Sequence, residues 1–293
     1  MAAASDFVLD HVILFLSDLA RTERAFTQHL GLQITSHADH PGFGTRNGAI
    51  AFQLGFLELL TEDDPTVLRS SRYGRLFLER HERRGDGPAV FVFETPSFDD
   101  VIAQCRARGG LCEDTKIGYS RGADGVAHEW KAALMPGTEP VYLDPRLPVL
   151  GRARTRPAKT PGDHPIGVRR LDAVVIAVQD LDSTVELYQT QLGLTPSTLE
   201  THGGIRTARF PLTRTGQQVV AAASARGPNE VTAHLSRHGE GVFAVQVSVN
   251  DLEAARAELE RRGARPRPLE WLSGLPATDP EVTANTRFVV CQA

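Results

Sequence analysis

The sequence is poor in aromatic residues, in cysteine and in long apolar runs, and each shortage excludes a class of protein. Aromatic residues make up 6% of the 293 residues, so the core must be mainly aliphatic. Apolar runs such as residues 12–16 extend over about five residues, whereas a membrane span needs about 20. The three cysteines are odd in number and follow no metal-site spacing, and no Lys or Arg precedes Arg21. We therefore expect a soluble, cytoplasmic protein with no membrane partner.

Charge and motif content exclude further functions. The net charge of −4 argues against nucleic-acid binding, which usually needs a strongly basic face. No GxSxG, GxGxxG, HExxH or Walker-type loop occurs, so nucleophilic hydrolase, dinucleotide-dehydrogenase and P-loop functions have no support. Hydrophobic residues (41%) and charged residues (23%) are at ordinary globular levels. At roughly 100–200 residues per domain, the length predicts two domains or one large one.

An internal repeat is the strongest organisational signal. The segment Leu9–Leu19 matches the segment Leu171–Leu181, and each begins with an apolar strand. Each copy continues as an amphipathic helix that starts beside an Asp and reaches a Gly 13 residues later. The Asp suits a helix N-cap, and the Gly suits the left-handed position at the C-terminal end. The two pairs are Asp18 with Gly31 and Asp180 with Gly193.

A second, weaker pair of units has the same order of elements. Apolar strands at 89–93 and 242–247 each lead into a helix that ends at Gly109 or Gly263. Three strands follow each helix. In the second unit we place them near 112–119, 126–135 and 140–144. The chain thus contains four βαβββ units with the approximate bounds 7–62, 87–146, 169–224 and 241–293.

The segments between the units set the domain organisation. Residues 65–84 and 228–240 are expected to form helical connectors. The stretch from Pro145 to Gly167 is rich in Pro and Arg and is typical of an extended linker. We therefore predict a first domain over 1–150, a linker over 151–168 and a second domain over 169–293.

Several short motifs accompany this order of units. They are Leu9-Asp10-His11-Val12, His40-Pro41-Gly42 with Gly44, Thr45 and Asn47, Leu57-Glu58-Leu59-Leu60, Arg121 with Asp124, Gly125 and Trp130, and His164-Pro165 with Gly167. With these motifs, the four βαβββ units resemble the vicinal oxygen chelate (VOC) superfamily. The superfamily includes glyoxalase I, extradiol dioxygenases, fosfomycin-resistance enzymes and bleomycin-binding proteins. The first half is similar to its glyoxalase-like branch.

The resemblance implies an α+β fold in which four βαβββ modules pair into two glyoxalase-like domains. Paired modules should curl into a half-open barrel, a cup that holds a small molecule. In metal-using members, His or Gln on first strands and Glu on last strands hold a divalent ion that chelates two oxygens of the substrate. His11 and Glu58 match these ligand positions in the first module.

The residues themselves support a role for this pair. Glu58 lies between leucines in an apolar strand, and a buried carboxylate needs a metal, a cation or a hydrogen-bond donor as its partner. The alternative is a strand-end Glu paired with an Arg, and a His bonded to backbone. The position of His11 is taken by Val90, Ala173 and Ala244 in the other units.

The ligand set is therefore incomplete. Tyr142 aligns with Glu58 in the second unit, and the last strands of units three and four carry no acid. A metal ion would need a further ligand from Asp144, His40 or His128, because tight sites usually have three or four. Whether a divalent metal is present stays open, and the second half is expected to be structural.

Two further groups of polar and aromatic residues could line the cup. His40, Thr45 and Asn47 lie at a loop with two glycines that leads into a strand, and could orient a substrate oxygen or could belong to an ordinary turn. The second group would suit an aromatic or acidic ligand, unless Trp130 is simply core. It consists of Arg121, His128, Trp130 and Tyr142.

Two functions remain open at this point. The first is a glyoxalase-like enzyme, a lyase, isomerase or dioxygenase acting on a small oxygenated molecule. In it, Glu58 is the base or a ligand, and His11 is a ligand or proton carrier. The second is a metal-free protein that sequesters a small molecule, as bleomycin-binding proteins do. The partner in both is a small molecule, and the assembly is left open, with a homodimer as one option.

Overall fold

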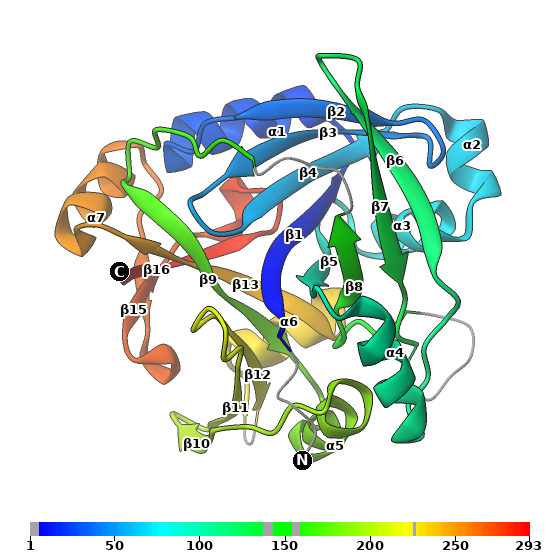
Figure 1. Cartoon of the computed structure of the whole chain (residues 1–293). Helices are drawn as coiled ribbons and strands as arrows, with labels where there is room; N and C mark the ends of the chain where they lie inside the picture. The colour runs from blue at the N-terminus through cyan, green and yellow to red at the C-terminus, as the bar shows by residue number, and fades with distance from the viewer. Residues whose placement is uncertain (1–5, 137–142, 154–158, 225–226) are drawn as a thin grey trace.

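The computed structural model describes residues 6–136, 143–153, 159–224 and 227–293. Figure 1 shows the first half of the chain at the upper right and the second half at the lower left, each built around one curved sheet. The first sheet is a closed barrel in the order β1-β4-β3-β2-β6-β7-β8-β5, and the second is an eight-stranded sheet in the order β10-β11-β12-β9-β13-β16-β15-β14. The architecture is α+β, as the sequence predicts.

The first half contains two units and two connecting helices. The first unit consists of β1 (Val8–Leu16), α1 (Leu19–Ala25), the π-helix η1 (Phe26–Leu30), β2 (Ser36–His40), β3 (Thr45–Ala51) and β4 (Phe56–Glu62). The connectors are α2 (Pro65–Ser70) and α3 (Arg72–Arg84). The second unit consists of β5 (Gly87–Glu94), α4 (Phe98–Ala107), β6 (Lys116–Gly122), β7 (Ala127–Ala133) and β8 (Val149–Ala153).

The second half repeats this arrangement. The third unit consists of β9 (Val168–Ala177), α5 (Leu181–Leu192), β10 (Thr198–His202), β11 (Ile205–Pro211) and β12 (Gln218–Ser224). The connector is α6 (Glu230–His238). The fourth unit consists of β13 (Gly241–Val249), α7 (Leu252–Arg261), β14 (Arg267–Leu269), η2 (Glu270–Leu272), β15 (Leu275–Ala277), η3 (Pro280–Val282) and β16 (Arg287–Gln292). No helix in the described ranges is long and apolar enough to cross a membrane.

The four-unit prediction is confirmed by the strand pairing. In each half, the first strand pairs in parallel with the last strand of its own unit and antiparallel with the first strand of the next unit. His11 lies opposite Phe56 and Ala173 lies opposite Gln218, so His11 and Ala173 occupy equivalent positions. The predicted caps are also present, because Asp18 accepts from the backbone N–H of Arg21 and Asp180 from that of Asp182.

Two features of the first sheet differ from expectation. The strand that completes the second unit is β8 at Val149–Ala153, later in the chain than expected; most of the strand predicted near 140–144 lies outside the described residues. Asp144 instead turns back to accept hydrogen bonds from the backbone and guanidinium of Arg146. The expected half-open barrel is closed, because the outer strands β2 and β6 pair at Ala38 and Asp39.

One hydrophobic core runs through both halves. It includes Leu9 and Val12 of β1, Val174 of β9 and Val245 of β13, all fully buried. In the second half, the concave face of the sheet is filled by a separate apolar cluster that contains Phe243, Trp271 and residues of α6. Among the described residues of the second half, this cluster occupies the place that corresponds to the cavity of the first barrel.

Gln217 joins the two halves through its side chain. Its Oε1 accepts from the backbone N–H of Leu9 at 3.0 Å, and its Nε2 donates to the carbonyls of Leu9 and Leu171 at 2.8 Å each. The residue is fully buried, so these backbone groups have no access to water.

Replacing Gln217 with Ala should destabilise the fold by roughly 2–4 kcal/mol, because buried backbone donors and acceptors lose their partner. Urea unfolding of the full chain measures the change. Gln189→Ala, on the exposed face of α5, is the matched control. Equal stability of the two variants would show that the Gln217 bonds do not hold the halves together.

Candidate functional site

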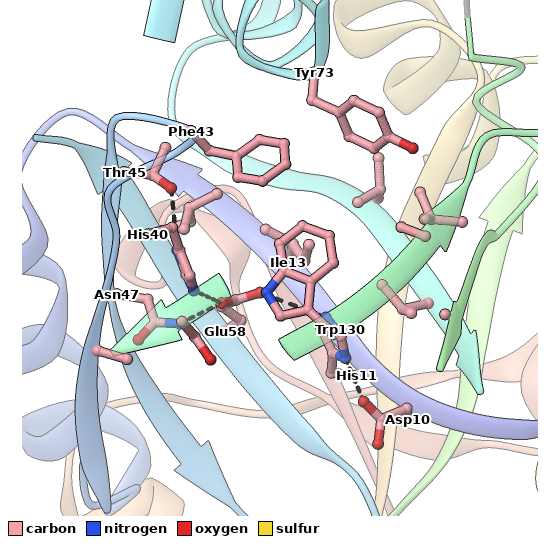
Figure 2. Close-up of a pocket in the computed structure, with 18 of the residues that line it drawn as sticks. Asp10, His11, Ile13, His40, Phe43, Thr45, Asn47, Glu58, Tyr73 and Trp130 are labelled. Carbon is pink, nitrogen blue, oxygen red and sulfur yellow. Dashed lines mark hydrogen bonds and ion pairs between the residues drawn. The ribbon is translucent and has the colours of Figure 1, made fainter. Parts of the chain in front are cut away.

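The barrel encloses a cavity of about 160 Å³ at the concave faces of β1, β3, β4 and β7. A cavity of about 150 Å³ accepts benzene, so this space suits a molecule of about one aromatic ring. Part of its polar lining consists of Glu94, Ser120, Lys131, Arg152 and Lys159. A second set of polar groups comes from four neighbouring strands, and Figure 2 shows them pointing toward one another. They are Asp10 and His11 of β1, His40 of β2, Thr45 and Asn47 of β3, and Glu58 of β4.

The carboxylate of Glu58 is the centre of this group. Its Oε1 accepts a short hydrogen bond from Asn47 Nδ2 and lies 3.7 Å from His40 Nε2. Its Oε2 lies 3.4 Å from His11 Nε2. The other nitrogen of His11 is bonded to Asp10 at 2.7 Å, and His40 Nδ1 contacts Thr45 Oγ1 at 3.1 Å. The six strand residues therefore form one connected network (Figure 2).

Burial and close contacts move the pKa values of these groups in different directions. Burial disfavours the charged form of His11, but the hydrogen bond to Asp10 and the contact with Glu58 outweigh it and raise the His11 pKa above 6.5. Burial lowers the His40 pKa, and Glu58 only partly compensates. Burial would raise the Glu58 pKa, but His11, His40 and Asn47 lower it from 4.5 to about 2. At neutral pH the network therefore holds an ionised Glu58 and a neutral His40, and its contacts favour the charged form of His11.

Aromatic side chains cover the opposite wall. Phe43 stacks on Trp130 with ring centroids 5.0 Å apart, and the edge of Tyr73 meets Phe43 at 5.9 Å. Phe56 stacks on His11 at 4.3 Å, and Lys159 Nζ lies 4.9 Å above the Phe56 ring. Rings on one side and a charged network on the other favour a flat ligand that carries an oxygen at one end.

The turn between β2 and β3 places Phe43, His40 and Thr45 together. The carbonyl of His40 accepts from the N–H groups of Phe43 and Gly44, at 2.9 and 3.0 Å. Gly44 has a φ of +67°, and a Cβ there would lie 2.4 Å from the carbonyl oxygen of Asp64. Only glycine therefore lets the turn pack against the start of α2 and present Phe43 to the cavity.

Comparison with family models assigns the chain to a family. A model described as "Glyoxalase-like domain" matches residues 9–193, which is more than half of the chain. The chain belongs to this glyoxalase-like family. A second model, "Glyoxalase/Bleomycin resistance protein/Dioxygenase superfamily", matches residues 170–270. The predicted membership of the VOC superfamily is thus confirmed. A search of curated protein sequences finds no match.

Solved structures show the same fold. A variant of 4-hydroxymandelate synthase from Streptomyces coelicolor is 17% identical, with a TM-score of 0.69 over 98% of this chain and 93% of that chain. A hypothetical protein from Staphylococcus aureus is 10% identical, with a TM-score of 0.68 over 97% of this chain and 100% of that chain. A methylmalonyl-CoA epimerase from Streptomyces coelicolor is 25% identical over 43% of this chain and 100% of that chain, with a TM-score of 0.38.

The glyoxalase-like cup contains six of the residues that the sequence nominated and omits others. His11, His40, Thr45, Asn47, Glu58 and Trp130 line it. Arg121 lies exposed on β6 beside β2, and His128 lies on β7 facing Ser120; neither lines the cavity. Tyr142 lies outside the described residues. Glu58 of β4 lies opposite Ile13 of β1. The equivalent residue of β8 is Val149, which lies opposite Val92 of β5. The second module therefore has no acid at the position of Glu58.

Sequence reasoning missed three residues of the site. Asp10 binds His11, Phe43 stacks on Trp130, and Tyr73 reaches the cavity from the connecting helix α3. The two glycines around Phe43 gave a usable signal, because they allow an apolar ring at the tip of a tight turn. Tyr73 gave none, since its helix lies outside the βαβββ units.

The donor groups of this glyoxalase-like cup do not fit a resident metal ion as they are arranged. In the described part of the chain, no group of three or more His, Cys, Asp or Glu side chains is placed to hold one. Both oxygens of Glu58 already contact Asn47, His11 and His40, and Asp144, the further acid considered above, bonds to Arg146. The chemistry derived below uses the side chains alone.

Proposed function

We propose that the cup binds a small oxygenated compound of about one aromatic ring and transfers a proton on it, with Glu58 as base and His11 as acid. The observation that carries the proposal is the position of a buried carboxylate and a buried imidazole 3.4 Å apart in the wall of the cavity. Such a pair is suited to remove a proton from one atom of a ligand and to donate one to another.

The pKa shifts support these roles. Glu58 is ionised and can accept a proton, whereas His11, with its pKa raised, holds one. Glu58 is a weak base in the resting network because His11 lowers its pKa. A ligand oxygen that accepts the proton of His11 Nε2 would remove the contact between His11 and Glu58. Burial would then raise the Glu58 pKa, so binding itself would strengthen the base.

The remaining polar residues orient the reacting groups. Asp10 fixes the ring of His11 through Nδ1, which leaves Nε2 directed at Glu58 and the cavity. Asn47 holds one oxygen of Glu58 and has a buried Oδ1 with no hydrogen-bond partner. A ligand hydroxyl that donates to this oxygen would remove the cost of burying it. The proposal therefore favours a ligand that carries both a carbonyl and a hydroxyl, such as a 2-hydroxy ketone.

The alternative is a protein that binds such a ligand without changing it. One observation favours it: the polar side chains of the cup bond mainly to one another, so they form a rigid wall before any ligand arrives. Contact of the ligand with the stacked rings of Phe43 and Trp130 would then supply most of the affinity.

One experiment separates the two functions. The chain has two tryptophans, so a Trp271→Phe background leaves Trp130 in the cup as the only fluorophore of its kind. A panel of aryl ketones and aryl 2-hydroxy ketones is screened for quenching of Trp130. Compounds that quench are then incubated with the protein in D2O, and loss of the proton next to the carbonyl is followed by NMR. We expect exchange with at least one hydroxy ketone. If compounds quench Trp130 but none of them exchanges its proton, the proposal of an enzyme is wrong and the cup only binds its ligand.

A further inference from the structure

A second cavity, of about 260 Å³, lies beside α3 and adjoins the cup. The two cavities share four lining residues, so they are neighbours. The shared residues are Tyr73, Phe77, Val90 and Val149. The ring of Tyr73 contacts Phe43 of the cup edge-on (Figure 2), and its hydroxyl is buried.

Two buried polar atoms of this second cavity have no hydrogen-bond partner. In the described residues, five buried side-chain nitrogen or oxygen atoms are left without one. Two of the five, Tyr73 OH and Arg80 Nε, belong to residues that line the cavity beside α3, and a third, Asn47 Oδ1, belongs to the cup. An unsatisfied buried donor is costly, so two of them around one space indicate a missing acceptor.

The charges around this cavity are mainly positive. Among the described residues that line it, Arg80, Arg83 and Arg84 stand against one acid, Glu79, which is 3.7 Å from Arg83. Arg84 donates to the backbone oxygen of Glu240 at 2.9 Å. Burial lowers the pKa of Arg80 to about 9, and Arg84 adds to the effect, so Arg80 is still charged at neutral pH.

The neighbouring helix does not balance this charge. His234 and His238 of α6 line a small hollow on the other side of Arg80 and Arg84. Burial, together with His238, Arg287, Arg84 and Arg80, lowers the pKa of His234 to about 3. The basic side chains thus crowd one another, and an anion would relieve that repulsion.

We propose that the cavity beside α3 is an anion-binding subsite in which Arg80 and Tyr73 hold a phosphate or carboxylate group of the ligand whose ring lies in the cup. The proposal rests on the function proposed above, because it assigns the second end of the same ligand. A guanidinium and a phenol hydroxyl both donate, and neither has a protein acceptor at these atoms. The shared wall at Tyr73 places the anion next to the aromatic end of the ligand. The substrate class is therefore a small aromatic, oxygenated acid or phosphate ester.

The test compares matched probes by calorimetry of the full chain in a buffer free of phosphate. The probes are ω-phenylalkyl phosphates with one to four methylenes, the corresponding phenylalkanols, and inorganic phosphate. We expect the best phosphate ester to bind at least about 10-fold more tightly than its alcohol, the usual scale for a hydrogen-bonded charged group. Arg80→Gln should remove that advantage and leave alcohol binding unchanged. Tyr73→Phe, which keeps the ring, should remove part of it.

Controls separate this proposal from the one it rests on. Arg75→Gln, exposed on the same helix and outside both cavities, should bind every probe like the unmodified chain. Alcohols that bind with no gain from the phosphate would overturn the subsite and leave the function of the cup intact. Failure of both alcohols and esters, with inorganic phosphate still bound through Arg80, would overturn the link between the cavities and count against the cup as a ligand site.

Discussion

Replacing Glu58 with Gln should reduce turnover at least about 100-fold and leave the chain folded, because Gln keeps the size of the side chain but cannot accept the proton. Asn47 can adapt to the change. Its Oδ1 has no partner in the resting structure, so a rotated amide could accept from the new Gln side chain. The barrel wall should therefore stay closed, and the loss should appear in kcat.

The same variant should also be less stable near neutral pH. The folded-state pKa of Glu58 is lowered from 4.5 to about 2, so the ionised carboxylate stabilises the fold above pH 4.5, and this stabilisation is lost as the pH falls toward 2. At about 1.36 kcal/mol per unit, a shift of this size corresponds to roughly 3 kcal/mol. Urea unfolding at pH 7 and at acid pH should show the difference between variant and parent shrinking as the pH falls below 4.5.

Glu62→Gln is the matched control for both measurements. Glu62 ends the same strand, and its ion pair with Arg69 spans 4.0 Å at an exposed position. It should retain full activity and stability. If Glu58→Gln lowers stability but leaves activity per folded molecule unchanged, Glu58 is a structural ion-pair partner and the proposed base must be abandoned.

The repeat made most of the fold predictable from sequence. Matching spacings from Asp18 to Gly31 and from Asp180 to Gly193 located two helices, and the apolar segments before these helices located the strands β1 and β9. The closing strand β8 was missed because Pro145 and Pro148 made the region resemble a linker. Pro148 directly precedes β8, so its missing N–H removes no bond from the strand.

The candidate site was only partly predictable, for a physical reason. His11 and Glu58 are each conspicuous as a polar residue in an apolar strand, and alternation alone gives the face on which they lie. The contact between them depends on the register of β1 against β4, which local sequence does not determine. The aromatic wall depends on a turn and on α3, which approach the barrel only in the folded chain.

Replacing His11 with Gln should cause the largest change in stability, and the change should depend on pH. His11 lies between Asp10 and Glu58, and removing it leaves two carboxylates in a buried site without their shared cation. Breaking a buried ion pair from one side typically costs about 3–5 kcal/mol, and we expect a loss of this size at pH 6. Urea unfolding across pH 5.5–9 measures it.

The sign of the pH dependence follows from the raised pKa of His11. Its stabilising contribution is complete below the unfolded value of 6.5 and is lost as the pH rises through the higher folded value. The parent should therefore lose stability on the alkaline side, and His11→Gln should lose less, so the two curves approach each other toward pH 9. His40 acts in the opposite direction, because its lowered pKa makes the folded state less stable as the pH falls below 6.5.

Two further variants separate these contributions. His40→Gln should remove the acid-side loss, and His202→Gln, exposed on β10, should leave the pH profile unchanged. A constant difference between His11→Gln and the parent from pH 5.5 to 9 would mean that His11 is not charged in the folded state. In that case the proton proposed for the ligand oxygen could not come from His11, and the acid would have to be sought elsewhere in the cup.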